Sequence, residues 1–320
     1  MSDKTALVTG ATGLLGRQVV RAFERGKWNV KGTGYSRADG SSVLKVDLVN
    51  AEQVEATLDN VKYVLCAANR FPDKCDKDPE GTRALNVEAT RRLASLCAAR
   101  GILLIYISTD YVFPGRPGEA PYEADAKPEP TNLYGQTKLD GERVVLEEYQ
   151  RAGKAGLGVV LRVPVLYGDA EVPSESAVNV LMDTVWKAQE PGIKIKMDHW
   201  ALRYPTNDAN VFITEDVGRV CHDISVKYLG ADDPSKLPYI LQFSSESKYT
   251  KYEICQLFGE IMGLSIANIE PNTEGNDPNA SVQRPYDCHL STKALKNIGI
   301  EVATQDFTGW WRWNVRAFRK

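Results

Sequence analysis

The stretch Thr5-Ala-Leu-Val-Thr-Gly-Ala-Thr-Gly-Leu-Leu-Gly16 decides the fold of this chain. It begins with a short apolar run, typical of a buried parallel strand, and apolar residues at helical spacing follow from Leu14 onward. Gly10 permits a tight turn between them, Gly13 lets the backbone approach a phosphate, and Gly16 lets the helix pack closely on the strand. The helix N-terminus offers N–H groups and a positive dipole end to an anion. A strand, a glycine turn and a helix in this order predict dinucleotide binding.

Composition excludes several other classes of protein. The 320 residues are 43% hydrophobic and 25% charged, with a formal net charge of −3, so there is no electrostatic case for nucleic acid or an anionic membrane. No apolar run approaches membrane-spanning length, and the N-terminus has no apolar signal region, which predicts a cytosolic protein. The six cysteines form no C-x-x-C pair and the three histidines are far apart, so we expect reduced thiols and no metal site.

The residues after the second expected strand, 28–33, bear on the choice of cofactor. NAD-selective proteins place an acidic residue here to accept hydrogen bonds from the adenosine ribose. This chain has Tyr35, Ser36 and Arg37 instead, and a guanidinium with a hydroxyl suits a 2′-phosphate. The pattern therefore favours NADP(H). Two alternatives remain open: Arg37 is an ordinary surface residue, or the nearby Asp39 takes the ribose role.

Further strands are expected at 43–48, 61–68 and 102–107, with helices at 52–58 and 79–100 between them. The run 102–107 is almost wholly apolar, as in a strand covered on both faces. The alternation predicts an α/β, Rossmann-type doubly wound parallel sheet. Residues at the ends of these strands are expected to contact the cofactor: Asp47, Leu48, Cys66, Ala67, Ala68 and Arg70.

A candidate catalytic group follows the last of these strands. Tyr134 and Lys138 are four residues apart at the start of an expected helix, so they share one helical face. A nearby ammonium is expected to lower the pKa of the tyrosine from its usual value of about 10. The hydroxyl of Thr109 or Ser108 is expected to hold a substrate carbonyl while Tyr134 transfers a proton.

Longer motifs carry a resemblance to a known family. Ser108-Thr-Asp-Tyr-Val-Phe-Pro-Gly115 and Tyr134-Gly-Gln-Thr-Lys-Leu-Asp-Gly-Glu142 resemble the dTDP-4-dehydrorhamnose reductase branch of the extended short-chain dehydrogenases/reductases. The chain more closely resembles the non-catalytic members of that branch, the β (regulatory) subunits of methionine adenosyltransferase. This second resemblance covers nearly the whole chain through Thr9–Arg17, Leu161–Gly168, Met197–Thr206 and Gln283–Pro285. One departure is Ser36, which replaces the first of the two arginines that these subunits have after their second strand.

The resemblance implies further properties. It implies an NADP(H) site that also includes Thr12, Leu14, Leu15 and Leu166, and retention of Thr109, Tyr134 and Lys138 even in the regulatory family. It also implies that a C-terminal tail docks on the catalytic subunit of methionine adenosyltransferase. Two functions therefore stay open: an NADP-binding regulatory subunit, which the resemblance favours, and an NADPH-dependent reductase of a nucleotide-linked 4-keto sugar.

We expect a Rossmann domain at 1–168 and a smaller lobe at 169–320, with strands near 207–245 rejoining the sheet. Helices are expected at 176–189, 214–229 and 251–262, a strand at 238–243, and a loop at 272–281. His199 with Trp200 fits an ordinary core pair, and Asp110 fits a turn. The tail 307–320 holds three of the six tryptophans, Trp310, Trp311 and Trp313, together with arginines. Composition alone fits both a partner-binding surface and a helix packed on its own lobe; the resemblance favours the partner.

Overall fold

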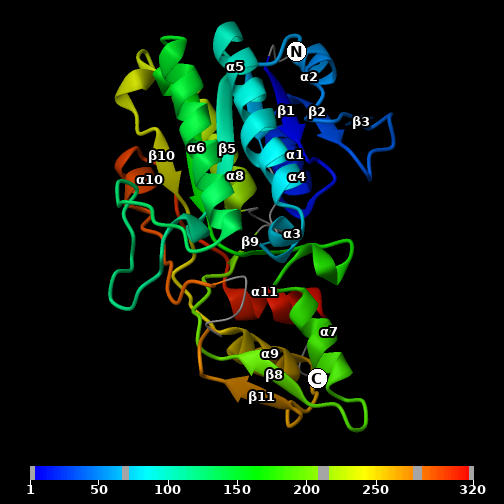
Figure 1. Cartoon of the computed structure of the whole chain (residues 1–320). Helices are drawn as coiled ribbons and strands as arrows, with labels where there is room; N and C mark the ends of the chain where they lie inside the picture. Colours follow the sequence, from blue (N-terminus) through cyan, green and yellow to red (C-terminus); the bar gives the residue numbers. More distant parts are fainter. Residues whose placement is uncertain (1–3, 67–71, 208–215, 277–282, 317–320) are drawn as a thin grey trace.

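The computed structural model describes residues 4–66, 72–207, 216–276 and 283–316. Its larger part is a seven-stranded sheet with the order β10-β6-β5-β4-β1-β2-β3, in which every neighbouring pair is parallel (Figure 1). This is the doubly wound, Rossmann-type arrangement that the glycine motif predicts. Its strands are β1 (Thr5–Thr9), β2 (Asn29–Gly34), β3 (Val43–Lys45), β4 (Tyr63–Cys66), β5 (Leu103–Thr109), β6 (Gly158–Val163) and β10 (Ile240–Gln242).

Alternate residues of these strands belong to two apolar cores, one on each face of the sheet. Ala6 and Val8 pack with helices α1 (Leu14–Arg25) and α8 (Asp216–Leu229), whereas Leu7 packs with α5 (Thr90–Arg100) and α6 (Leu133–Arg151). This follows from the two-residue period of a strand, and it explains why β1 and β5 are buried along their whole length. Helix α2 (Ala51–Thr57) contacts α5, and α10 (Lys293–Asn297) contacts β10.

The helix expected at 79–100 has the predicted bounds, but its middle is π-helical. The chain forms α4 (Pro79–Arg83), a π-helical turn at Ala84–Ala89, and then α5; α3 (Pro72–Lys77) precedes them. The π-helical turn brings the buried Asn86 side chain toward α6, where its amide donates a 3.1 Å hydrogen bond to Thr137. Single π-helical turns of this kind are frequent at functional sites.

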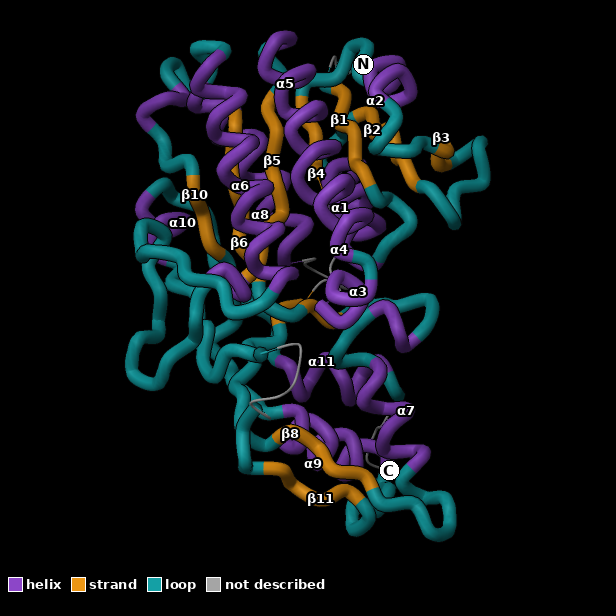
Figure 2. Tube along the Cα trace, in the orientation of Figure 1, coloured by secondary structure: helices purple, strands orange, loops and turns teal. Residues whose placement is uncertain are grey.

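The smaller lobe lies beyond the carboxyl ends of the large sheet's strands (Figure 2). Its core packs α7 (Val180–Lys187), α9 (Lys251–Met262) and α11 (Phe307–Asn314) with the parallel pair β8 (Ile195–Asp198) and β11 (Ile269–Asn272). A second short parallel pair, β7 (Leu166–Tyr167) and β9 (Thr206–Asn207), lies where the chain passes between the two parts. Helix α9 has the bounds predicted from the sequence because Thr250 and Glu253 form a reciprocal capping box at its start.

Elements from the C-terminal half also complete the large part of the molecule. Helix α8 falls in the region expected at 214–229, and β10 falls within the strand expected at 238–243 and extends the sheet beyond β6. The other expected boundaries differ by a few residues: β3 ends at Lys45 and α7 begins at Val180. Such shifts are typical at element ends, where periodicity gives little information.

The tryptophans of α11 divide into two groups, which corrects the prediction that all three anchor a partner. Trp310 and Trp311 are 7% and 0% exposed and pack with Tyr167 and Phe258 in the lobe's own core. Trp313 is 42% exposed. An amphipathic helix must place part of its surface inward, and here that part includes two of the three indoles. Only Trp313 stays accessible to a partner.

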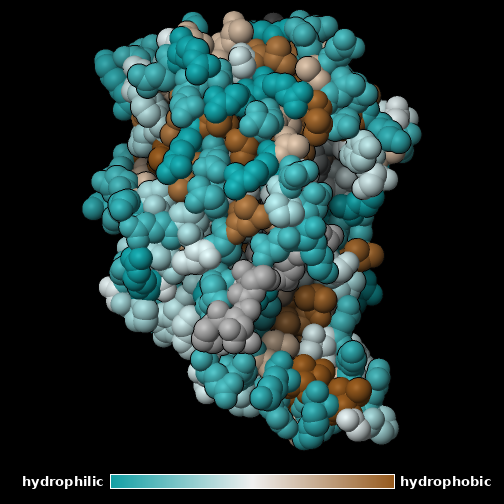
Figure 3. Space-filling model, viewed as in Figure 1, coloured by the Kyte–Doolittle hydropathy of each residue, from teal (hydrophilic) through white to brown (hydrophobic). Residues whose placement is uncertain are grey.

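The surface is mostly polar on the face drawn in Figure 3, where apolar residues occur in separate patches. In the portion of the chain that the structure describes, no helix combines the length and apolar character needed to span a membrane.

Candidate cofactor and catalytic site

A cavity of about 610 Å³ lies over the carboxyl ends of the central strands, between the large sheet and the smaller lobe. In doubly wound sheets this is the expected place for a ligand. The cavity brings together most of the residues singled out from the sequence: Gly10, Thr12, Gly13, Leu14, Leu15, Gly16, Ser36, Arg37, Thr109, Tyr134, Lys138 and Leu166.

The glycine turn has the geometry that a pyrophosphate needs. Gly10 has a φ of +66°, a left-handed conformation that favours glycine. A Cβ on Gly16 would lie 2.1 Å from the Gly10 carbonyl oxygen, so only glycine allows α1 to start this close to the turn. No side chain caps the N-terminus of α1 at Gly13, so its first N–H groups face the cavity without a side-chain acceptor.

Lys138 is held deep in the cavity wall. Asn132 caps α6 by accepting a 2.9 Å hydrogen bond from Gly135 N–H, and the helix carries Lys138 one turn further in. The ammonium donates a 2.6 Å hydrogen bond to the Ile107 carbonyl and lies 4.2 Å from the centre of the Tyr106 ring. Burial lowers the pKa of Lys138 to about 8, although Cys66 and Glu142 act in the opposite direction. The charged form of Lys138 is therefore destabilised by its burial.

Tyr134 differs from the expectation that the nearby lysine would lower its pKa. Burial raises the pKa of Tyr134 above its usual value, and a hydrogen bond with Thr109 only partly offsets this. Desolvation dominates because the Tyr134 side chain is buried in the cavity wall. At neutral pH the tyrosine is thus a protonated acid, the form that donates a proton to a carbonyl oxygen.

Two further acids support this end of the site. The Thr109 hydroxyl donates a 2.9 Å hydrogen bond to Asp110, whose pKa is raised by burial to about 6. The Ser108 hydroxyl donates a hydrogen bond to Glu142. Arg162 donates two more to the same carboxylate, at 2.9 and 2.7 Å. The Glu142–Arg162 pair is almost fully buried and joins α6 to β6 beneath the strand end that carries Thr109. These contacts fix the polar groups at the end of β5.

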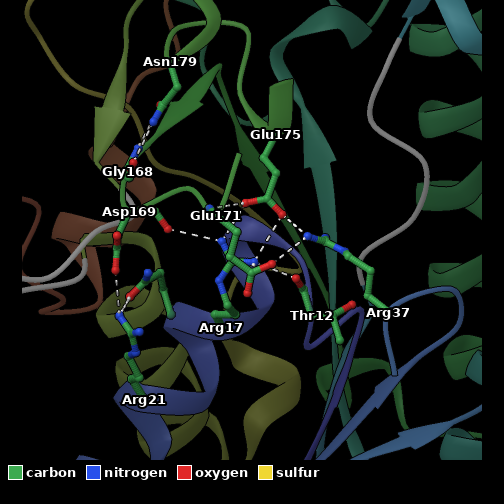
Figure 4. A network of polar contacts seen from close by, with 10 residues as sticks. Thr12, Arg17, Arg21, Arg37, Gly168, Asp169, Glu171, Glu175 and Asn179 are labelled. Atoms are coloured by element: carbon green, nitrogen blue, oxygen red, sulfur yellow. Dashed lines mark hydrogen bonds and ion pairs between the residues drawn. The ribbon is translucent and has the colours of Figure 1, made fainter. Parts of the chain in front are cut away.

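The other end of the cavity is closed by arginine–carboxylate pairs (Figure 4). Glu175 accepts hydrogen bonds from Arg17 at 2.7 Å and from Arg37, and Arg37 also donates to Glu171 at 3.1 Å. Burial alone would raise the pKa of Glu175, but the two guanidinium groups and the Glu171 N–H lower it to about 2. Arg37, the residue predicted to bind a 2′-phosphate, lines the cavity and is paired there with carboxylates of the chain itself.

Some predicted cofactor residues are not in the cavity wall. Tyr35 is 63% exposed, Cys66 is buried in the sheet core, and Asp47 and Leu48 lie outside the cavity lining. The Asp47 carboxylate accepts a hydrogen bond from Val49 N–H and thus stabilises its own turn. Asp39, the alternative ribose ligand, likewise accepts hydrogen bonds from its own loop. Ala67, Ala68 and Arg70 lie outside the described residues.

The structure adds residues that sequence reasoning missed or treated as structural. Glu175 comes from a segment with no recognisable motif, so no signal in the sequence indicated it. Arg17, which holds Glu175, directly follows the last glycine of the fingerprint, and that position was a usable signal. Among the described residues, no cluster of three His, Cys, Asp or Glu side chains forms a candidate metal site. Other additions to the lining are Leu85, Ile107, Asp110, Tyr111, Val163, Val165, Ser176, Arg203, Lys251 and Arg284.

Comparisons with known proteins agree with this geometry. Residues 4–314 match the model of a family described as the RmlD substrate binding domain. The chain is 40% identical over 300 residues to methionine adenosyltransferase 2 subunit beta of Xenopus tropicalis, covering 93% of this chain and 83% of that protein. For the Mus musculus protein of the same name the identity is 38% over 310 residues, covering 96% and 86%.

Solved structures share the fold. The dTDP-4-dehydrorhamnose reductase from Bacillus anthracis, solved in complex with NADP, superimposes with a TM-score of 0.76 at 21% identity and covers 99% of both chains. MoeE5, solved with UDP-glucose and NAD, has a TM-score of 0.76 at 22% identity, covering 97% of this chain and 99% of that one. A sequence match to the dTDP-4-dehydrorhamnose reductase of Streptomyces griseus, 38% identical, spans only 51% of this chain and 50% of that enzyme.

Proposed function

Because this chain belongs to the family of methionine adenosyltransferase 2 β subunits, within the wider RmlD-type family, we propose that it is an NADP-binding regulatory subunit. It associates with a methionine adenosyltransferase catalytic subunit and modulates the synthesis of S-adenosylmethionine. The observation that carries the proposal is identity of 40% spread over 93% of the chain, which includes the smaller lobe as well as the Rossmann part. All six cysteines are free buried thiols, which supports a cytosolic location.

The cofactor in this proposal is NADP(H). The uncapped start of α1 and the close glycine turn suit a pyrophosphate, and both line the cavity. Ser36 and Arg37 line the same cavity, at the end where an adenosine ribose would lie in a Rossmann fold. Lys138 and Tyr134 line the far end, where a nicotinamide would lie. When bound, the cofactor supplies or accepts a hydride; the chain's own residues bind and orient it.

The contact with the catalytic subunit is proposed to include the C-terminal tail. Trp313 is the one indole of α11 that its own lobe leaves substantially exposed. Arg312 beside it forms an exposed ion pair with Glu260 at 3.3 Å. An exposed tryptophan next to an arginine has the composition of an interface hot spot. Trp310 and Trp311 have no part in this contact, because they belong to the lobe's core.

Co-elution of this chain with a purified methionine adenosyltransferase catalytic subunit tests the assignment. The wild type should co-elute, and Trp313→Ala should weaken the complex at least tenfold while changing its own stability by less than about 0.5 kcal/mol. Trp186→Ala is the matched control, because Trp186 is likewise exposed, at 56%, but belongs to α7 and not to α11. No co-elution of the wild type would contradict the assignment. A complex unaffected by Trp313→Ala would contradict only the role of the tail.

A second function is favoured by one observation: Thr109, Tyr134 and Lys138 line one cavity beside the cofactor end. This arrangement suits an NADPH-dependent reductase of a nucleotide-linked 4-keto sugar. In that reaction Tyr134 would donate the proton, and Thr109 would hold the substrate oxygen. Oxidation of NADPH with a panel of nucleotide-linked 4-keto sugars tests it by absorbance at the nicotinamide band. Absence of turnover across the panel would leave the regulatory function alone.

A further inference from the structure

An acidic segment crosses the arginine end of the cavity. Residues 169–175, which we call the acidic strap, follow β7 and lead toward α7 of the smaller lobe. Three of the seven residues are carboxylates: Asp169, Glu171 and Glu175. Figure 4 shows all three facing arginines of the Rossmann part. The strap thus connects the smaller lobe to the cofactor side of the molecule by charge pairs.

Glu175 is the central contact of the strap. Its side chain is buried, and its two carboxylate oxygens accept hydrogen bonds from two arginines and from Glu171 N–H. Arg17 is anchored besides by a 2.6 Å bond to the Thr12 carbonyl, within the glycine turn. Among the described residues, Arg37 makes no such hydrogen bond to the backbone; its guanidinium contacts Glu171 and Glu175. Arg37 is therefore the more easily displaced partner.

The position of Glu175 has a consequence for the adenosine end of a cofactor. The residues after β2 lack the acid that NAD-selective proteins use, but Glu175 brings a carboxylate to Arg37 from 138 residues further along the chain. Ser36, Arg37 and Glu175 all line the cavity. A 2′-phosphate that binds Arg37 competes with this carboxylate, because both are anions that pair with the same guanidinium.

We propose that Glu175 determines the nucleotide preference of the site by competing with the 2′-phosphate of NADP(H) for Arg37. This proposal rests on dinucleotide binding as proposed above. Binding of NADP(H) requires Arg37 to exchange a carboxylate for a phosphate, whereas NAD(H) brings no 2′-phosphate and requires no exchange. The strap therefore lowers the preference for NADP(H) that Arg37 alone would give.

Removing the charge of Glu175 tests the proposal. Isothermal titration of NADP⁺ and NAD⁺ should show that Glu175→Gln tightens NADP⁺ by about tenfold and changes NAD⁺ by less than about threefold, since one charge-assisted bond to Arg37 is released. The same substitution in an Arg37→Ala background should leave NADP⁺ affinity unchanged. If Glu175→Gln has no effect in the Arg37→Ala background, the carboxylate acts through Arg37. A general loosening of the strap would change NADP⁺ affinity in both backgrounds.

Asp169→Asn is the matched control. Asp169 belongs to the same strap, but among the described residues its carboxylate forms an ion pair with the half-exposed Arg21 alone, at 3.5 Å, and neither residue lines the cavity. It should leave the ratio of the two affinities unchanged, and thermal melting should show that each variant folds. An unchanged ratio in Glu175→Gln, or an equal gain for both nucleotides, would overturn the role of Glu175 while leaving dinucleotide binding intact. If neither nucleotide binds to any variant, the proposed cofactor function itself fails.

Discussion

The two ends of the cavity differ in what sets the protonation of their buried groups. At the end near Tyr134 and Lys138, which we call the buried end, burial raises the pKa of the tyrosine and lowers that of the lysine, so it favours the neutral form of both groups. The end near Arg37 and Glu175 is held by ion pairs, which keep the carboxylate charged despite its burial. The comparison teaches that burial alone does not set protonation: a buried group keeps its charge where opposite charges surround it and tends to lose it where they are absent. Four predictions test this contrast.

The largest expected effect is on catalysis at the buried end. If the chain reduces a keto sugar, Tyr134→Phe should lower NADPH oxidation by about 10²–10⁴-fold, because it removes the proton donor. Binding of NADP⁺ should stay within about threefold of the wild type. Steady-state rates with and without the substitution provide the measurement. Equal rates would show that Tyr134 is not the general acid.

A large loss of stability is expected when the buried Glu142–Arg162 ion pair is broken. Arg162→Leu leaves the Glu142 carboxylate buried without its two guanidinium bonds, at a cost of about 3–5 kcal/mol in the free energy of unfolding. Urea denaturation measures it. Arg162→Leu combined with Glu142→Leu should recover part of the loss, since no unpaired charge then remains. Failure of the double substitution to recover any stability would attribute the loss to packing.

Lys138→Met should stabilise the protein by about 2 kcal/mol at pH 7, because a buried charge is removed. The sign follows from linkage: the pKa of Lys138 falls from 10.5 unfolded to about 8 folded, so the unfolded chain binds more protons between these values. The wild type should therefore gain stability as the pH rises from 8 to 10.5, and the variant should lack this gain. Parallel slopes in this window would contradict the lowered pKa.

The smallest expected effect is on stability at the arginine end, where the contribution of Glu175 depends on pH. The pKa of Glu175 falls from 4.5 unfolded to about 2 folded, so its contribution is present above pH 4.5 and is lost as the pH falls toward 2. Glu175→Gln should remove about 1–2 kcal/mol at pH 7, a charge-assisted bond discounted for the exposure of Arg37. Denaturation at pH 6 and pH 3 should show the difference between variant and wild type shrinking in acid.

The parts of the site that depend on local order could be predicted from the sequence. The glycine turn is a local motif whose spacing reports its own geometry, and Gly10 indeed takes a left-handed φ of +66°. Tyr134 and Lys138 share a helical face because they are four residues apart, and both line the cavity. The parallel sheet likewise followed from apolar strands alternating with helices.

Other features depended on which distant segments meet. The expected lowering of the Tyr134 pKa was wrong, because burial outweighs the lysine, and burial is a property of the packed molecule. The helix at 79–100 was predicted, but its π-helical turn at Ala84–Ala89 was not, because the helical pattern was assigned with a constant period of 3.6 residues. The tail's composition did not show which tryptophans face inward, since that depends on how α11 packs against α9 and Tyr167.

The sequence by itself determined the Rossmann-type fold, the pyrophosphate turn and the Tyr134–Lys138 pair. Each of them leaves a pattern among residues that are close together in the chain. Only the tertiary structure decided that Glu175 meets Arg37 across 138 residues, and that Trp311 lies in the core while Trp313 stays exposed. The physical reason is that charge pairing and burial are set by neighbours in space. Neither leaves a periodic trace in the order of the amino acids.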